Sequence, residues 1–206
     1  MKLSMDKAID KILTQVKPKV QAILRTRRHY EAHDLIGQFK THIWSLLEMH
    51  NGCIFYASDT QLSRLDAIQP RFLRELDVAE DVAFLNFNLA PTPLRRNIGI
   101  LGLLHKRVIG ECHPMFSTLL PFCVEMGQPT LPGGHDKQLY GYLHEARCQL
   151  ALFFRSIFAM VTVYNRLPQY VVNATTVHEF QKLLTRITRH QCVTGNVHWQ
   201  HQFSRR

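Results

Sequence analysis

Apolar residues recur at helical spacing from the start of the chain. They fall three or four positions apart in the first segment, at Ile9, Ile12, Leu13, Val16, Val20, Ile23 and Leu24. This spacing predicts one amphipathic helix over residues 3 to about 26, with lysines beside the apolar stripe. Because an interior proline costs a helix about 3 kcal/mol, Pro18 predicts a kink or a fresh helix start near Lys17.

Two further segments carry clear boundary signals. Residues 35–47 hold the next apolar face, and Asn51-Gly52 are residue types that end helices. Thr92 and Pro93 open the clearest helix, because threonine caps helices and proline at the first helical position loses no hydrogen bond. We expect that helix to end at Gly110.

A third helix is predicted between these two segments. Its apolar positions run over residues 62–76, and Asp59 or Thr60 is placed to cap its first turn. Pro70 predicts a bend within it. Asp77 and Glu80 then have the spacing of a capping box, which predicts a short helix to about residue 86.

Periodicity disappears after Gly110, where prolines and paired glycines gather up to Lys137. The continuous apolar run at residues 150–164 fits a buried helix or a strand, and its length favours a helix. Thr176 with Glu179 makes a second capping box ahead of the last apolar stripe.

These patterns predict an all-α protein, an irregular array of six or seven helices with a Pro/Gly-rich loop near residues 121–135. We expect a helical region over residues 1–120 and a loop or linker over 121–137. A carboxy-terminal helical extension over 138–190 and a polar, frayed tail over 191–206 complete the expected organisation.

Composition places the chain among globular proteins. It has 206 residues, 46% of them apolar and 20% charged, which is enough for one domain or two small ones without disulfides. The five cysteines are odd in number and form no Cys-x-x-Cys pair, which favours a reduced intracellular protein of the nucleus or cytoplasm. No signal peptide is visible, and the longest apolar run is broken by Arg155 and too short to span a bilayer.

Candidate catalytic or metal-binding groups are weak in this sequence. The adjacent acids Glu80 and Asp81 fall in the first turn of a predicted helix, where negative charge meets the helix dipole favourably. The cluster His190, Cys192, His198 and His201 matches no zinc-finger spacing. We therefore expect no catalytic residue, metal or cofactor on this chain, and an unrecognised Cys-His enzyme remains a third alternative.

Positive charge is the strongest chemical signal. Lysine and arginine total 25 against 16 acidic residues, and residues 1–30 alone hold eight of them against two aspartates. Arg64, Arg71 and Arg74 share the third predicted helix. The residues that we assign to phosphate contact are Arg25, Arg27, Arg28, Arg95, Arg96, Lys106 and Arg107. The competing interpretation is that basic residues at helix ends merely satisfy terminal carbonyls and the helix dipole.

Three stretches together resemble the carboxy-terminal region of non-LTR retrotransposon reverse transcriptases, downstream of the polymerase palm. They are VQAILRTRRHY at 20–30; YASDTQLSRLDAIQPRFLRELDV, AFLNFNLAP and LRRNIGILGLLH within 56–105; and VTVYNRLPQYVVNATTVHEFQKLLTRI at 161–187. The aromatic-x-Asp-Asp turn of that family's polymerase site is absent from this sequence.

The resemblance implies a thumb-like region and helical extension that grip a template-primer duplex without sequence preference. It predicts a non-catalytic fragment whose partners are an RNA or DNA duplex and the missing polymerase segment, with no membrane. The alternative is an inactive helical remnant, or an orphan structural protein, that retains no binding activity.

Overall fold

The computed structural model describes residues 5–49, 51–130, 134–141 and 154–204. In this part of the chain the secondary structure is helical, and an isolated bridge between Phe122 and Leu139 is its only β-type pairing. The predicted all-α class is confirmed.

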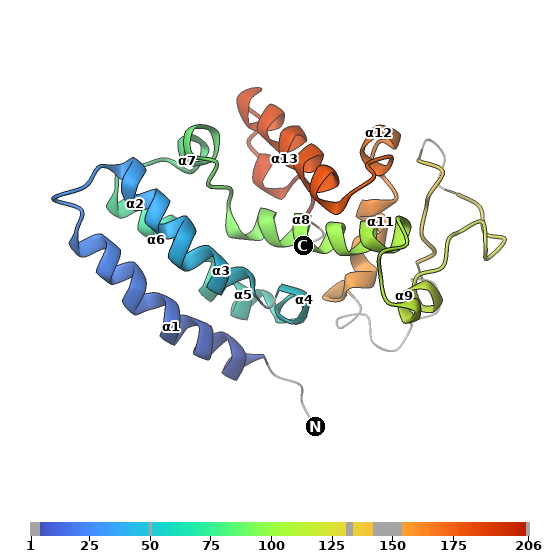
Figure 1. Cartoon of the computed structure of the whole chain (residues 1–206), viewed down its shortest axis with the longest axis horizontal. Helices are drawn as coiled ribbons and strands as arrows, with labels where there is room; N and C mark the ends of the chain where they lie inside the picture. Colours follow the sequence, from blue (N-terminus) through green and yellow to red (C-terminus); the bar gives the residue numbers. More distant parts are fainter. Residues whose placement is uncertain (1–4, 50, 131–133, 142–153, 205–206) are drawn as a thin grey trace. The chain divides into compact units, whose positions relative to one another are not determined.

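Proline and turn residues divide the expected segments into shorter helices (Figure 1). In chain order they are α1 Asp6–Arg25, α2 Ala32–Phe39, η1 Lys40–Trp44, α3 Ser45–Glu48, α4 Asn51–Ile54, α5 Asp59–Asp66, α6 Ile68–Glu75, α7 Glu80–Phe87, α8 Thr92–Val108, α9 Pro114–Leu119, η3 Ile157–Met160, α11 Val161–Tyr164, α12 Gln169–Val172, α13 Val177–Val193 and η4 Trp199–His201.

The chain divides into two compact units, Met1–Arg96 and Asn97–Arg206. The division falls inside helix α8, so it does not coincide with the joint that the sequence placed at 121–137. Apolar periodicity continues through α8 without a break and therefore carries no sign of this division. Residues 131–133 of the expected loop lie outside the described residues.

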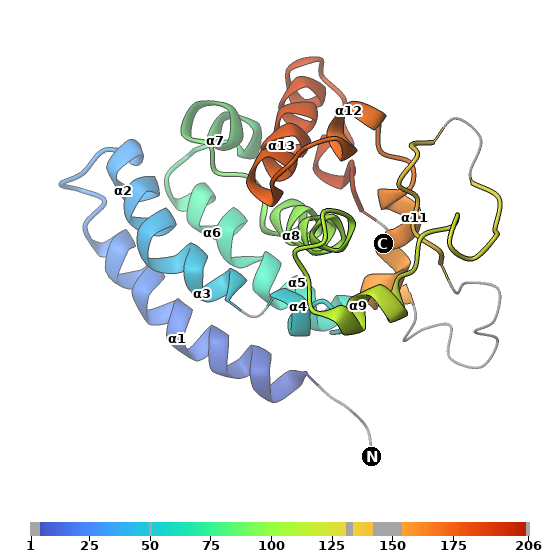
Figure 2. The same ribbon diagram turned by 45° about the vertical axis from the view of Figure 1, so that its right-hand side comes forward.

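Helix α1 of the first unit forms as its apolar spacing predicts. Its buried face packs against α2, α3, α5 and α6, and both views show it running alongside α2 and α3 (Figures 1 and 2). Pro18 lies inside this one continuous helix, so the alternative of a fresh start near Lys17 is wrong. Burial of the apolar face on four helices offsets the hydrogen bond that proline removes.

The predicted third helix is two helices, α5 and α6, that meet at Ala67. Pro70 explains the break, because it has no N–H to donate to the carbonyl of Asp66. The cap of α5 is Ser58 rather than Asp59 or Thr60: Ser58 and Gln61 form a reciprocal capping box.

Two other local predictions were wrong. The predicted cap of α7, Asp77, does not cap the helix. Asp77 has a left-handed conformation (φ 55°), and α7 begins at Glu80 with Ala79 as its cap and no side-chain hydrogen bond there. Asn51-Gly52 do not simply end a helix, because they begin the short helix α4.

In the second unit, α13 packs on the carboxy-terminal half of α8. A Cβ added at Gly102 of α8 would lie 2.5 Å from Nε2 of Gln181, so glycine permits this close approach. Thr176 accepts a hydrogen bond from the backbone of Glu179, which confirms the predicted start of α13.

The expected polar tail is in part wrong, because α13 continues to Val193 and both Trp199 and Phe203 are buried. Scattered aromatic residues carry no helical periodicity, so the sequence pattern gave no warning of this packing. In the apolar run at 150–164, residues 157–164 form η3 and α11, and residues 150–153 lie outside the described part.

Candidate nucleic-acid interface

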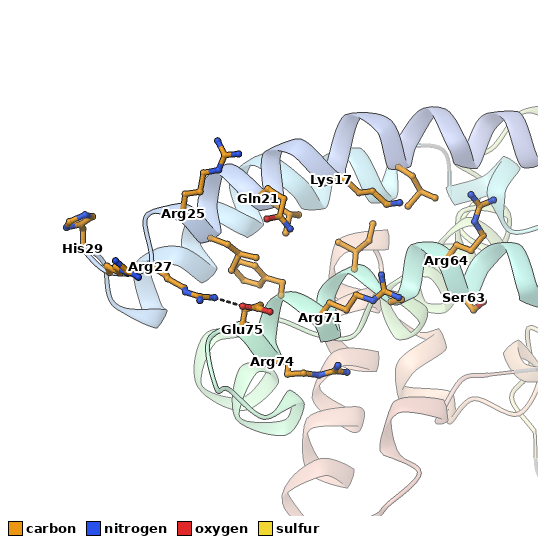
Figure 3. A pocket seen from close by; sticks show the side chains of 17 residues that line it. Lys17, Gln21, Arg25, Arg27, His29, Ser63, Arg64, Arg71, Arg74 and Glu75 are labelled. Carbon is orange, nitrogen blue, oxygen red and sulfur yellow. Dashed lines mark hydrogen bonds and ion pairs between the residues drawn. The ribbon is translucent and has the colours of Figure 1, made fainter.

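A groove of about 1430 Å³ lies between α1 and the helix pair α5 and α6 of the first unit (Figure 3). We call it the basic groove. Among its lining residues are seven cationic side chains, and Glu75 is the one carboxylate among them. The cations are Lys17, Arg25, Arg27, Arg28, Arg64, Arg71 and Arg74.

Helical spacing places these residues on the two walls. Lys17, Gln21 and Arg25 are four positions apart on α1, so they follow one edge of its buried stripe. Arg64 and Arg71 are seven positions apart and face the same gap from α5 and α6. The apolar residues between them form the floor: Leu13, Val20, Leu24, Ala67, Ile68 and Phe72.

Two of the cations are occupied by ion pairs that cross the groove. Arg64 Nη2 lies 2.6 Å from Asp10 Oδ1 of α1, and Arg27 pairs with Glu75 at the end of α6. Figure 3 shows Arg27 reaching across to Glu75. These pairs are solvent-exposed and contribute about 0–1 kcal/mol each, so we regard them as positioning contacts.

The other five groove cations have no acidic partner among the described residues. All five are exposed, and they are Lys17, Arg25, Arg28, Arg71 and Arg74. In Figure 3, Lys17 and Arg71 lie in the space between α1 and α6, whereas Arg25 points away from α6. The groove therefore concentrates positive charge that no carboxylate in the described part of the chain neutralises.

Three of the predicted arginines line this groove: Arg25, Arg27 and Arg28. Arg95 and Arg96 do not line it, and both make contacts inside the first unit. The Arg95 guanidinium lies over the Trp44 ring, 3.6 Å from its centre, and donates to both carboxylate oxygens of Glu48. Arg96 is buried against Asp66. We leave both arginines out of the interface because each guanidinium is held in an internal ion pair.

Lys106 and Arg107 belong to the second unit. Arg107 is buried; it donates from Nε to the Leu120 carbonyl at 3.1 Å and lies over the Phe122 ring. Lys106 is exposed on α8. Neither residue lines the basic groove.

Four lining cations were not assigned to phosphate contact from the sequence: Lys17, Arg64, Arg71 and Arg74. Their helical spacing was visible, but nothing in it showed that α1 packs against α5 and α6. Only that packing turns two separate basic edges into one groove.

A buried polar cluster in the second unit was also missed. His105 Nδ1 lies 3.0 Å from the Tyr164 hydroxyl, and its Nε2 lies 2.9 Å from the Ala174 carbonyl, with the Phe180 ring stacked on the imidazole. Burial lowers the pKa of His105 and raises that of Tyr164. Both ring nitrogens have partners, so this cluster is a structural support with no group left for a ligand.

Metal chemistry finds no support in the described part of the chain, where no group of three or more His, Cys, Asp and Glu side chains could hold an ion. Glu80 and Asp81 lie in the first turn of α7, as expected. None of the helices described is long and apolar enough to cross a membrane. Cys148 lies outside the described residues.

No family model, curated protein or solved structure matches this chain.

Proposed function

We propose that this protein binds nucleic acid through backbone phosphates held in the basic groove, without catalysing a reaction there. The observation that carries the proposal is the set of five exposed, unpaired cations lining one groove of the first unit. Phosphate contacts of this kind gain free energy from counterion release and carry no sequence information.

The concave form of the site favours a nucleic-acid chain over an anionic membrane. A flat bilayer surface touches only the rims of a groove, whereas a flexible polyanion also reaches Lys17 and Arg71 in the space between the walls. A helix that binds a membrane surface also needs an apolar face that is free of protein contacts and can be buried in the lipid. The apolar face of α1 is already packed within the unit.

The origin of the module is part of the same proposal. The stretches VQAILRTRRHY and YASDTQLSRLDAIQPRFLRELDV, which resemble the region downstream of a retrotransposon reverse-transcriptase palm, supply most of both walls. A template or primer strand is then the natural ligand, and the polymerase segment is the expected protein partner. The alternative is a helical remnant that has lost binding.

The test is a titration of fluorescent oligonucleotides at several salt concentrations, followed by anisotropy. The variant Lys17→Ala/Arg71→Ala removes one unpaired cation from each wall. Its matched control, Lys11→Ala/Lys19→Ala, removes the same charge from exposed positions of α1 outside the groove. Two lost contacts should weaken binding about 25-fold for a single strand and about 60-fold for a duplex at 0.1 M salt.

Equal losses in the variant and its control would show that net charge, and not the groove, drives association. If the unaltered protein shows no salt-dependent binding to any oligonucleotide, the inactive-remnant alternative holds. Primer extension by the purified chain alone would contradict the absence of catalysis.

A further inference from the structure

We infer that the basic groove accepts a single nucleic-acid strand of about four or five nucleotides, and not a duplex. This inference rests on the proposed function and names its ligand more closely. It departs from the duplex that the sequence resemblance implied. Three features of the groove support it: its width, its length and its lining.

The width can be judged from the contacts that join the two walls. Gln61 Nε2 donates to Asp6 Oδ1 at 2.6 Å, and Arg64 Nη2 lies 2.6 Å from Asp10 Oδ1. At the other end Arg27 of the α1 terminus meets Glu75 of α6. The walls are therefore no farther apart at either end than two side chains meeting tip to tip.

A duplex does not fit between walls held in this way. Its major groove alone is about 12 Å wide and admits a whole α-helix, so the duplex itself is wider still. A duplex could rest only on the outer edges of the basic groove, away from Lys17 and Arg71. A single strand can enter and reach the cations of both walls.

The length sets the number of nucleotides. On α1 the lining runs from Leu13 to Arg25, which at 1.5 Å per residue is about 18 Å. The opposite wall runs over the same number of residues, from Ser63 to Glu75. Each nucleotide of a stacked strand advances about 3.4 Å along the strand axis, so this length takes about five nucleotides at most. Five unpaired cations are present to meet them.

The lining matches the two faces of a single strand. Leu24 and Ala67 are half-buried in the apolar floor, between the cationic edges. Unpaired bases present apolar ring faces that gain from leaving water, while the phosphates stay at the cations. A duplex hides those ring faces in its stack and would leave the floor uncovered.

The experiment compares a ten-nucleotide oligo-dT strand with a ten-base-pair blunt duplex, using the full chain at 0.1 M salt. An open basic surface binds the duplex more tightly than the single strand, because the charge density of the duplex is greater. We expect the single strand to bind at least about tenfold tighter, opposite to that electrostatic preference. In a series from two to ten thymidines, affinity should rise steeply to about five nucleotides and then level off.

Two isosteric variants locate the strand. Gln21 lines the groove on α1, whereas Gln15 is exposed on the same helix outside it. Gln21→Glu and Gln15→Glu change net charge equally. We expect Gln21→Glu to weaken single-strand binding about fivefold, the equivalent of one phosphate contact, and Gln15→Glu to change it less than twofold.

The outcomes separate this inference from the proposed function. Duplex binding as tight as single-strand binding, or equal effects of Gln21→Glu and Gln15→Glu, would overturn the inference. The first of these results leaves nucleic-acid binding itself in place. Failure of both ligands to bind would overturn the proposed function together with the inference.

Discussion

The clearest test of the division between structural and ligand-facing arginines is the Arg96–Asp66 pair. The Arg96 side chain is 5% exposed, with Nη2 2.5 Å from Asp66 Oδ1 and Nη1 3.2 Å from Asp66 Oδ2. Its Nε is buried without a hydrogen-bond partner among the described residues. Among the described residues, Asp66 is the only acidic side chain paired with this guanidinium.

The magnitudes follow from which charge is left buried. Asp66→Leu leaves the guanidinium uncompensated, and we expect a loss of about 3–5 kcal/mol in the free energy of unfolding. Arg96→Met leaves a carboxylate that is 21% exposed and can be hydrated, so the loss should be smaller, about 1.5–3 kcal/mol. The double variant replaces both charges with apolar groups, and we expect it to be within about 1 kcal/mol of the original protein.

Urea unfolding followed by circular dichroism measures the four stabilities of this cycle. Oligonucleotide binding provides the second readout: Arg96→Met should bind within about twofold of the original protein, whereas Lys17→Ala/Arg71→Ala should not. If Asp66→Leu is no more damaging than Arg96→Met, the guanidinium is not desolvated as described. If Arg96→Met binds as weakly as the groove variant, Arg96 belongs to the interface after all.

Three further predictions concern other parts of the molecule. Glu75→Gln should free Arg27 for phosphate, tightening oligonucleotide binding about fivefold and steepening its salt dependence, and weaker binding would contradict this role. Burial lowers the pKa of His105 and His135 below the ordinary 6.5, so the unfolded chain binds protons more readily. Their contribution to stability is therefore complete above pH 6.5 and falls as the pH drops below it; urea midpoints that do not fall between pH 7.5 and 5.5 would contradict this. Trp199→Ala should lower the free energy of unfolding by about 3–5 kcal/mol, whereas a frayed tail predicts almost no change.

Periodicity predicted the helices best where one face is buried along its whole length. In α1 the apolar positions run through Pro18, and all six buried residues of that helix belong to the predicted stripe. Local signals worked when the cap and its partner were close in sequence, as at Thr176 and Glu179. At Asp77 the same signal failed, because a left-handed turn displaced the cap by two residues.

The candidate interface was predicted only in part, because arginines that look alike in sequence differ in their distant partners. Arg95 pairs with Glu48, 47 positions away in the sequence, and Arg96 pairs with Asp66, 30 positions away. No local sequence pattern predicts either pair. Arg71 and Arg74 occupy similar helical positions but meet no carboxylate among the described residues. Charge clustering indicated where cations gather, whereas helix packing decided which of them line the groove without an acidic partner among the described residues.

The paired and unpaired cations of the first unit complement each other. Arg64 forms an ion pair with Asp10, and Arg27 forms one with Glu75. These pairs join the walls near the two ends of the basic groove. Exposed pairs add little stability, so the apolar packing of α1 on α5 and α6 is what holds the walls at this separation. A site whose width is fixed before binding loses less conformational entropy when a ligand enters. Asp10 and Glu75 therefore narrow the ends of the groove while they occupy two of its seven cations, which leaves the other five to act together.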